Sequence, residues 1–299
     1  MLMNYKSVLF FLGILQGLVA QDPAPPATYD FEEDEVYLTT RQMWMDQLEE
    51  KLTVAGLDSL TAWASLHKDW ETVLDYAPQA FTRSPTAQRF YQWGGAAGFQ
   101  SLAVARIFAL PYVEKMKEGF KKAYALDPQN KFILTALIET YSVLPGLIGG
   151  NITYAQEKAA ELAAIDPIEG AFAKGYIAEV EHQKSMAKLH YQKAFDLFKA
   201  QNSTREKYLE KARREWLYEM GSVAARFEME YEVGSQLLHH YLALYSKKDT
   251  VPLAWVYYRL GQLSLLEAKP QEALAYLEKA KKLNPKLEGL AATLKEAKP

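Results

Sequence analysis

Cysteine is absent from the 299-residue sequence, and neither sign of charge dominates it. Without cysteine the chain has no disulfide bonds, no thiolate zinc site, no catalytic thiol and no lipid attached to an N-terminal cysteine. Its 34 basic and 37 acidic side chains leave a net charge of −3, which gives no general attraction to nucleic acid or anionic lipid. We therefore expect a fold held together by packing alone, and no nucleic-acid partner.

Motifs for catalysis and metal binding are also missing. The sequence has no phosphate loop between a strand and a helix, and no His-Glu-x-x-His helix. The run Gly94–Gly98 superficially resembles a nucleotide loop, but it lies within a helical pattern, which favours close helix packing. His182 and His190, with a nearby glutamate, are a candidate metal group, although ordinary histidines are the preferred interpretation. We predict no catalytic residue, no metal and no cofactor.

Long apolar runs are missing after residue 20, so we expect no integral membrane segment in the rest of the chain. Before that point, Lys6 precedes an apolar run from Val8 to Leu15, and small residues follow. This is the pattern of a secretory signal peptide. We predict a signal peptide over residues 1–20, cut after Ala20, with Gly17 as the alternative site; a retained anchor is the other interpretation. The mature chain would be periplasmic or secreted.

Residues 21–34 are rich in proline and alanine and end in acidic residues. Such a stretch is typical of an extended tether, and its acids favour the start of the next helix. The segment from Glu35 to Gly56 has a helical apolar pattern that includes Met43, Leu48 and Leu52. We expect this helix to cap the domain that follows.

An internal repeat is clearest near the C-terminal end. Its first helix is marked by Tyr257, Leu260, Gly261 and Ser264, its second helix by Ala273, Leu277 and Ala280, and its end by Pro285. The large apolar residues recur at helical spacing and predict a buried face, whereas the small residues let the two helices approach closely. Proline cannot continue a helix, so it closes the unit.

The same pattern recurs upstream with variations. Its marks are Leu57, Leu60, Ala64, Val73, Ala77, Ala80 and Pro85 in the first unit; Val104, Ile107, Met116, Phe120, Ala123 and Pro128 in the second; Leu137, Ile138, Tyr141, Ala155, Ala159, Leu162 and Pro167 in the third; Ala171, Gly175, Ala178, Ala187, Tyr191 and Ala194 in the fourth; and Leu217, Met220, Gly221, Ala224, Val233 and Leu237, with His240 in place of the last alanine, in the fifth. We expect Pro78 to break the second helix of the first unit early.

This spacing resembles the tetratricopeptide repeat (TPR) family, whose unit is a helix–turn–helix of about 34 residues. The resemblance implies an all-α, right-handed α-solenoid of tandem TPR-like repeats, which we assign to residues 35–299. It also implies a scaffold for protein–protein interaction rather than an enzyme. Our principal hypothesis is an exported, non-catalytic scaffold that binds a protein or peptide partner in its concave groove.

An insertion within one unit points to an alternative. Residues 143–150, Val-Leu-Pro-Gly-Leu-Ile-Gly-Gly, lengthen the connection between two helices, and the glycines permit backbone angles closed to other residues. A loop of this kind inside a repeat resembles periplasmic repeat proteins akin to the T component of TRAP-type transporters. That resemblance implies a periplasmic accessory of a transporter, which binds a small ligand in a closed pore.

The first helix of each pair is expected to line the concave wall of the stack. Aromatic residues recur at the positions that face this wall, and such residues are favoured in interfaces because they bring a large contact area with a polar tip. Arginines beside them suit a carboxylate of the partner. The predicted partner- or ligand-binding residues are Phe172, Tyr176, Glu179, Tyr218, Arg226, Trp255, Tyr258, Arg259 and Gln262. The alternative is that these aromatic residues only pack against the next helix; the partner's identity and the oligomeric state stay open.

Overall fold

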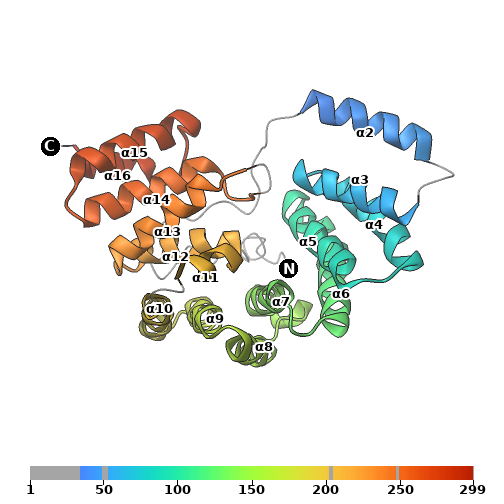
Figure 1. Cartoon of the computed structure of the whole chain (residues 1–299), viewed down its shortest axis with the longest axis horizontal. Helices are drawn as coiled ribbons and strands as arrows, with labels where there is room; N and C mark the ends of the chain where they lie inside the picture. Colours follow the sequence, from blue (N-terminus) through green and yellow to red (C-terminus); the bar gives the residue numbers. More distant parts are fainter. Residues whose placement is uncertain (1–33, 49–52, 202–204, 247–248, 299) are drawn as a thin grey trace, which may run out of the picture. The chain divides into compact units, whose positions relative to one another are not determined.

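A computed structural model describes residues 34–48, 53–201, 205–246 and 249–298, and within these ranges the chain contains helices and no strand (Figure 1). The α-helices are α2 (Glu35–Leu48), α3 (Val54–Leu66), α4 (Trp70–Arg83), α5 (Ala87–Ala103), α6 (Leu110–Leu126), α7 (Lys131–Val143), α8 (Ile152–Ile165), α9 (Pro167–Val180), α10 (Lys184–Lys199), α11 (Arg205–Lys211), α12 (Arg214–Arg226), α13 (Tyr231–Ala243), α14 (Leu253–Leu266), α15 (Pro270–Leu283) and α16 (Leu290–Glu296). Two short 3-10 helices are η2 (Arg106–Phe108) and η3 (Gly146–Ile148). The predicted all-α class is confirmed. The predicted signal peptide, its cleavage site and nearly all of the tether lie outside the described residues.

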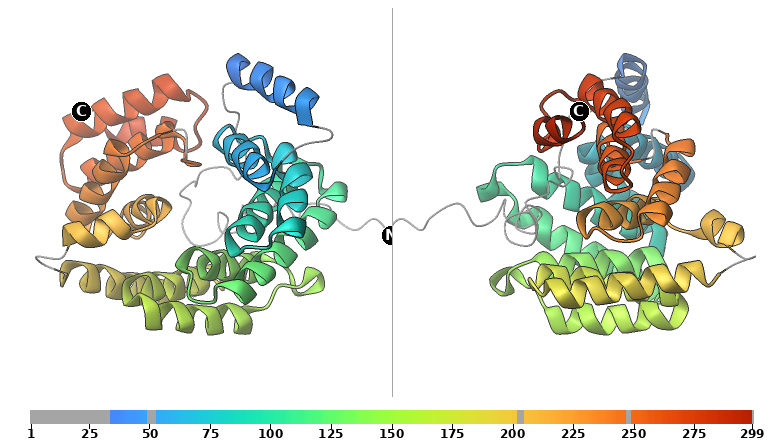
Figure 2. Two further views of the ribbon diagram at one scale, coloured as in Figure 1. Left: turned by 45° about the vertical axis from the view of Figure 1, so that its right-hand side comes forward. Right: turned by 90° about the vertical axis from the view of Figure 1, so that its left-hand side faces the viewer.

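The described chain forms two compact units, which divide within α8 between Lys158 and Ala159. Unit 1 contains α2 to α7 and the first half of α8, and unit 2 contains the remainder through α16. In both units consecutive helices pack as antiparallel pairs: α3 on α4, α5 on α6, α9 on α10, α12 on α13 and α14 on α15 (Figure 2). Each unit is therefore built of helix hairpins, as the repeat pattern predicts.

Small residues set the distance between paired helices. A Cβ atom on Gly261 of α14 would lie 2.7 Å from Leu277 of α15, too close for an unshifted side chain. In unit 1 the contact is between backbones, because a Cβ on Gly119 of α6 would lie 2.8 Å from the Cα of Gly94 in α5. The run Gly94–Gly98 thus lies inside a helix and permits close packing, and the interpretation from its helical context is confirmed.

Four helix pairs in the described ranges share one tight turn. Its middle residue has left-handed backbone angles, and the next residue donates its N–H to a carbonyl five residues earlier, at 2.8–3.0 Å. The left-handed residues are Lys68, His182, Glu228 and Ala268, and the accepting carbonyls belong to Ala64, Ala178, Ala224 and Ser264. Such a bond satisfies one of the carbonyls that a helix end leaves without a partner. The connections of α5 to α6 and of α7 to α8 are longer and contain η2 and η3.

The turn between α12 and α13 is one residue longer than the other tight turns, and both Glu228 and Glu230 have left-handed backbone angles. This extra residue shifts the second helix by one position relative to the predicted register. Tyr241, which is fully buried, occupies the close contact that we assigned to His240, and His240 is only half-buried. That part of the repeat assignment was wrong, because the pattern alone does not show the length of a turn.

Two further sequence expectations were wrong. Val104 and Ile107 do not mark a first helix, because α5 ends at Ala103 and Ile107 lies in η2. Pro111 stands in the first turn of α6, where the missing N–H costs no helical bond, so it fixes the start of that helix nearby. Pro78 does not break its helix: α4 continues to Arg83, because one lost backbone bond is outweighed by the packing of the buried face.

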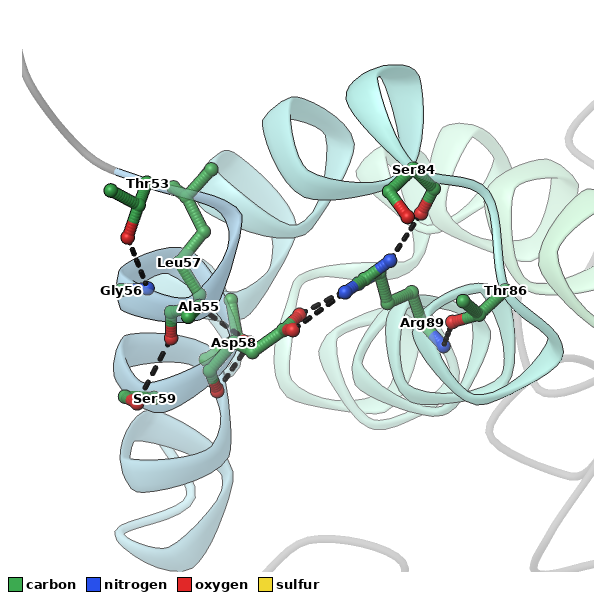
Figure 3. A network of polar contacts seen from close by, with 10 residues as sticks. Thr53, Ala55, Gly56, Leu57, Asp58, Ser59, Ser84, Thr86 and Arg89 are labelled. Carbon is green, nitrogen blue, oxygen red and sulfur yellow. Dashed lines mark hydrogen bonds and ion pairs between the residues drawn. The ribbon is translucent and has the colours of Figure 1, made fainter.

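Polar contacts join first helices within unit 1. Arg89 of α5 places Nε 2.7 Å and Nη2 2.6 Å from the carboxylate oxygens of Asp58 in α3, and its remaining nitrogen donates to the carbonyl of Ser84 (Figure 3). The hydrogen bonds from Arg89 lower the pKa of Asp58. This two-pronged geometry fixes both distance and orientation between the two helices.

The N-terminal helix α2 is fixed to unit 1 by a single buried tyrosine and its neighbours. Tyr37 stacks on His67 with 4.3 Å between ring centroids and donates its hydroxyl to Asp69 at 2.6 Å. Arg41 contacts the same carboxylate oxygen at 2.6 Å. Met43, one of the apolar residues expected to hold this helix, is exposed, so it does not contribute to the contact. The expected single helix up to Gly56 was wrong, because Thr53 caps the start of a separate helix, α3, at Val54.

Candidate functional site

All nine predicted binding residues lie in unit 2, on the first helices of its three pairs. We call this set the first-helix face: Phe172, Tyr176 and Glu179 on α9; Tyr218 and Arg226 on α12; and Trp255, Tyr258, Arg259 and Gln262 on α14. The helical spacing predicted that the members from one helix would share a side. The structure adds which of them meet across helices, and what each one contacts.

Glu179 joins α9 to both neighbouring helices. Its carboxylate accepts a hydrogen bond from the Tyr191 hydroxyl of α10 at 2.6 Å. It also accepts both terminal nitrogens of Arg226 from α12, with the Nη2–Oε2 distance at 3.2 Å. A two-pronged pair of this kind is directional as well as strong. The ion pair therefore fixes the orientation of Arg226 at the edge of the first-helix face.

An aromatic cluster surrounds Tyr191, the residue that donates its hydroxyl to the carboxylate of this ion pair. The Tyr191 ring lies 5.1 Å from the ring centroid of Phe172 and 5.1 Å from that of Phe227. Burial raises the pKa of Tyr191 well above its ordinary value, and the adjacent Glu179 carboxylate raises it further. The hydroxyl thus stays protonated and keeps donating to the carboxylate across the whole physiological pH range.

A second polar group is centred on Arg259, whose side chain is fully buried. Its Nη1 donates to Oε1 of Gln262 at 2.7 Å, and the Gln262 amide nitrogen donates to the Tyr258 hydroxyl at 3.2 Å. The guanidinium carbon lies 5.4 Å from the Tyr258 ring centroid and 5.8 Å from that of Trp255. These are distances at which a ring face stabilises a cation. Arg259 is therefore held by aromatic rings and an amide together.

Tyr218 of α12 is buried, and it feels both guanidinium groups electrostatically. Burial raises the pKa of its hydroxyl, and the positive charges of Arg259 and Arg226 act in the opposite direction. The Tyr218 hydroxyl has no hydrogen-bond partner among the described residues. Near the C-terminal end of the chain, the Tyr258 hydroxyl of α14 is 3.3 Å from Thr293 of α16. Polar contacts therefore join α9 to α12 and, separately, α14 to α16.

Burial divides the first-helix face into two classes. Six members are buried: Phe172, Glu179, Tyr218, Trp255, Tyr258 and Arg259. The three that are half-exposed are Tyr176, Arg226 and Gln262. Without rearrangement of the chain, a partner can contact only these three. For the buried aromatic residues, the structure favours the alternative of packing against neighbouring helices.

A second charged group lies in the first halves of α9 and α12. Arg213 precedes α12 and contacts Glu169 of α9 at 2.8 Å and Glu219 of α12 at 3.3 Å. Burial raises the pKa of Glu219, and Arg213 acts in the opposite direction. A nearby carboxylate, Glu215, raises it as well. This group contains more carboxylates than guanidinium groups, whereas near the C-terminal ends of α9 and α12 one carboxylate, Glu179, faces one guanidinium, Arg226.

Sequence reasoning missed two residues that complete these contacts: Tyr191 and Thr293. Tyr191 stands at the repeat position that Leu277 occupies in the last unit. A tyrosine in place of leucine at this buried position was the available signal, because a buried hydroxyl requires a partner. For Thr293 the sequence contained no such signal.

Metal and membrane chemistry find no support in the part of the chain that the structure describes. No three histidine, aspartate or glutamate side chains gather there in an arrangement suited to a metal ion. In the same ranges, no helix combines the length and apolar character needed to cross a bilayer.

Comparison with known proteins gives the following. The fold is that of TPR-like helical repeats. No protein-family model and no curated protein matches the sequence. A tetratricopeptide repeat protein from Parabacteroides merdae shares 11% identity over 88% of this chain and 91% of its own, with a TM-score of 0.48. A TPR protein from Thermus thermophilus shares 20% identity over 71% of this chain and 98% of its own, with a TM-score of 0.42. The repeat assignment rests on the spacing and helix pairing described above.

Proposed function

We propose that the chain is an exported, non-catalytic scaffold that binds a protein or peptide segment on the first-helix face of unit 2. A fold of TPR-like helix pairs suggests an interaction scaffold. The observation that supports the location is a pair of fixed polar contacts, Glu179 with Arg226 between α9 and α12 and Arg259 with Gln262 on α14, which reach solvent at Arg226 and Gln262 beside the half-exposed Tyr176. Residues fixed in this way bind a partner without losing side-chain freedom at that moment.

The contacts also narrow the chemistry of the partner. Arg226 is already held by Glu179 through two hydrogen bonds, so a carboxylate from a partner has to compete with a carboxylate of the chain itself. Tyr176 instead presents a ring with a polar tip, and Gln262 presents an amide with donor and acceptor groups. An uncharged, extended peptide segment with apolar side chains suits these groups better than an acidic one.

A site-specific photo-crosslink tests the location. We expect a photoreactive residue at Gln262 of α14 to capture a partner from the native envelope fraction, identified by mass spectrometry. The matched control is the same residue at Gln271, which is exposed on the second helix α15 of the same pair. Equal crosslinks at both positions, or a crosslink at Gln271 alone, would place the binding surface elsewhere.

A pair of variants tests the contribution of the half-exposed residues. We expect Y176A/Q262A to lose the captured partner, and Y276A/Q271A on α15 to keep it, with both variants folded by circular dichroism. If no protein is captured by any form and a metabolite co-purifies in native mass spectrometry, the transporter-accessory alternative is favoured instead. That alternative rests on the loop of residues 143–150 and on the general layout of the repeats, and it stays a prediction.

Export is tested separately. We expect the chain recovered from the native cell envelope to begin at Gln21 when its N-terminus is sequenced. A chain that begins at Met1 and stays with the cytosolic fraction would contradict export, and it would leave the crosslinking result unaffected.

A further inference from the structure

Two loops of unit 1 expose large apolar side chains to solvent. They are residues 104–109, which contain η2, and residues 144–151, which contain η3; we call them the apolar loops. Leu147 is 98% exposed, Ile107 is 74% exposed and Phe108 is 61% exposed. The four tight turns of the other helix pairs place Lys68, His182, Glu228 and Ala268 at the corresponding corner. Among these within-pair connections, only the two longer ones carry large exposed apolar side chains. The packing of the helices does not require these side chains to be apolar.

The second apolar loop is rigid, so the exposure of Leu147 is built into it. Backbone N–H groups of Gly150 and Asn151 donate to the carbonyls of Pro145 and Tyr141, both at 2.9 Å. Gly149 has a φ of +94°, and a Cβ on Gly150 would lie 1.6 Å from a backbone oxygen. The two glycines are therefore required by a closed backbone. A loop held this tightly keeps its leucine in water instead of folding it back.

Both apolar loops flank the same helix. The first loop leads directly into α6, which begins at Leu110. The second loop is attached to α6 by Lys117, whose ammonium group donates to the carbonyl of Ile148 at 3.0 Å. Both loops also connect the first helix of a pair to its second, so repeat packing places them on one edge of unit 1. The exposed side chains therefore belong to one surface.

The first apolar loop and α6 together are basic, in contrast to the chain as a whole, although Glu114 and Glu118 pair with Lys117 and Lys122. The apolar loops contain Arg106 and no acidic residue. Residues 104–126 carry five basic side chains against two acidic ones, although the chain has a net charge of −3. Lys115 lies above the Tyr112 ring, 5.5 Å from its centroid. At a lipid surface, apolar side chains enter the acyl region and cationic side chains contact the headgroups. Exposed apolar side chains next to arginine, lysine and tyrosine match this arrangement.

We propose that the apolar loops dock unit 1 onto an anionic lipid bilayer. Ile107, Phe108 and Leu147 enter the boundary of the acyl chains, while Arg106 and Lys115 contact the phosphate groups. This peripheral attachment involves no helix that crosses the membrane. It is independent of the first-helix face in unit 2, and it locates the scaffold at a membrane surface whatever partner it holds.

The absence of cysteine permits a site-specific test on the full chain. An environment-sensitive fluorophore is attached to Leu147→Cys, and as a control to Leu189→Cys, which is 60% exposed on α10 of unit 2. Vesicles contain phosphatidylcholine with phosphatidylglycerol, or phosphatidylcholine alone. We expect a blue shift and brighter emission at residue 147 with the anionic vesicles, a weaker response with the neutral ones, and none at residue 189. If another apolar segment of the chain bound the vesicles, both labelled proteins would bind equally. A difference between the two labels therefore reports insertion of the loop itself.

Substitutions give a second readout by vesicle sedimentation. We expect F108S and L147S each to lower vesicle partitioning by about tenfold, since each removes one large apolar side chain from the bilayer. L189S should leave partitioning unchanged. R106Q/K115Q should remove the preference for anionic vesicles, as should high salt.

Three results would overturn the proposal. One is a label at residue 147 that stays in water while the chain sediments with vesicles. Another is an equal response at residues 147 and 189. The third is self-association in sedimentation velocity that L147S abolishes, because the loop would then be an interface between copies of this chain.

Discussion

Replacing Arg226 by methionine tests whether the ion pair with Glu179 holds the first-helix face together. The two partners are not equivalent, because the Glu179 side chain is 3% exposed and that of Arg226 is 19% exposed. In R226M the carboxylate stays buried with Tyr191 as its donor. In E179Q the guanidinium can still turn toward water. We therefore expect R226M to be more destabilising than E179Q.

The magnitudes follow from the burial of each group. Removing one partner of a fully buried pair costs about 3–5 kcal/mol. Because part of the guanidinium reaches solvent, we expect about 2–3 kcal/mol for R226M. For E179Q we expect about 1 kcal/mol, since the amide keeps an acceptor oxygen. The double variant removes both charges, so its cost should fall below the sum of the single costs by about 1–2 kcal/mol.

Hydrogen exchange of peptides from α9 and α12, read by mass spectrometry, measures these differences locally. This suits a repeat protein, whose helices open in parts rather than all at once. The matched control is K122M, which breaks the exposed pair of Lys122 with Glu118 in unit 1 and should change stability by less than about 0.5 kcal/mol. Equal costs for R226M and E179Q that simply add in the double variant would refute the reasoning.

Other predictions concern packing, pH and register. Gly95→Ala should raise the melting temperature by the equivalent of about 1 kcal/mol, because no atom lies within 4 Å of the new Cβ, whereas Gly119→Ala should cost about 1–3 kcal/mol against the backbone of α5. Burial alone would raise the pKa of Asp69, but hydrogen bonds from a tyrosine, a threonine and an arginine outweigh it and lower the pKa. The stabilisation by Asp69 is therefore present above the unfolded carboxylate pKa of about 3.9 and is lost as the pH falls through the lower folded value. D69N should be less stable at neutral pH and should show less acid dependence of the urea midpoint; an unchanged pH profile would contradict this. Y241A should cost about 3–5 kcal/mol and H240A less than about 0.5 kcal/mol in thermal unfolding, and the reverse order would restore the register predicted from sequence.

The repeat pattern predicted the fold wherever a small residue in one helix requires a close neighbour in the next. Gly261 facing Leu277 is such a case, because only a helix hairpin brings these positions within reach. The prediction failed where connections vary. One extra residue before α13 moves the contact from His240 to Tyr241. A helical period defines the side of a helix that is buried, but not the number of residues in a turn.

For the site, helical spacing placed all nine residues on the three first helices and did not reveal their burial. Burial depends on the neighbouring helix, and those neighbours are remote in sequence. Glu179 is 47 residues from Arg226, and no local pattern pairs the two. Tyr191 was assigned to packing from its repeat position, and its hydroxyl proved to hold the Glu179 carboxylate. At a buried repeat position, the polar groups of a side chain therefore have to be considered together with its size.

Ion pairs connect successive first helices in both units. In unit 1 an arginine of α5 contacts an aspartate of α3, and in unit 2 Arg213, just before α12, and Arg226 of α12 contact Glu169 and Glu179 of α9. In these three pairs the arginine comes from the later segment, whereas Arg214 of α12 contacts Asp249, which precedes α14, in the opposite order. Such pairs, together with close contacts such as that of Gly170 in α9 with Ala163 in α8, set the register between hairpins. These ion pairs also neutralise charged side chains that could otherwise bind a partner. Recognition on the first-helix face therefore has to rely on Tyr176 and Gln262, or on a partner charge strong enough to displace Glu179 from Arg226.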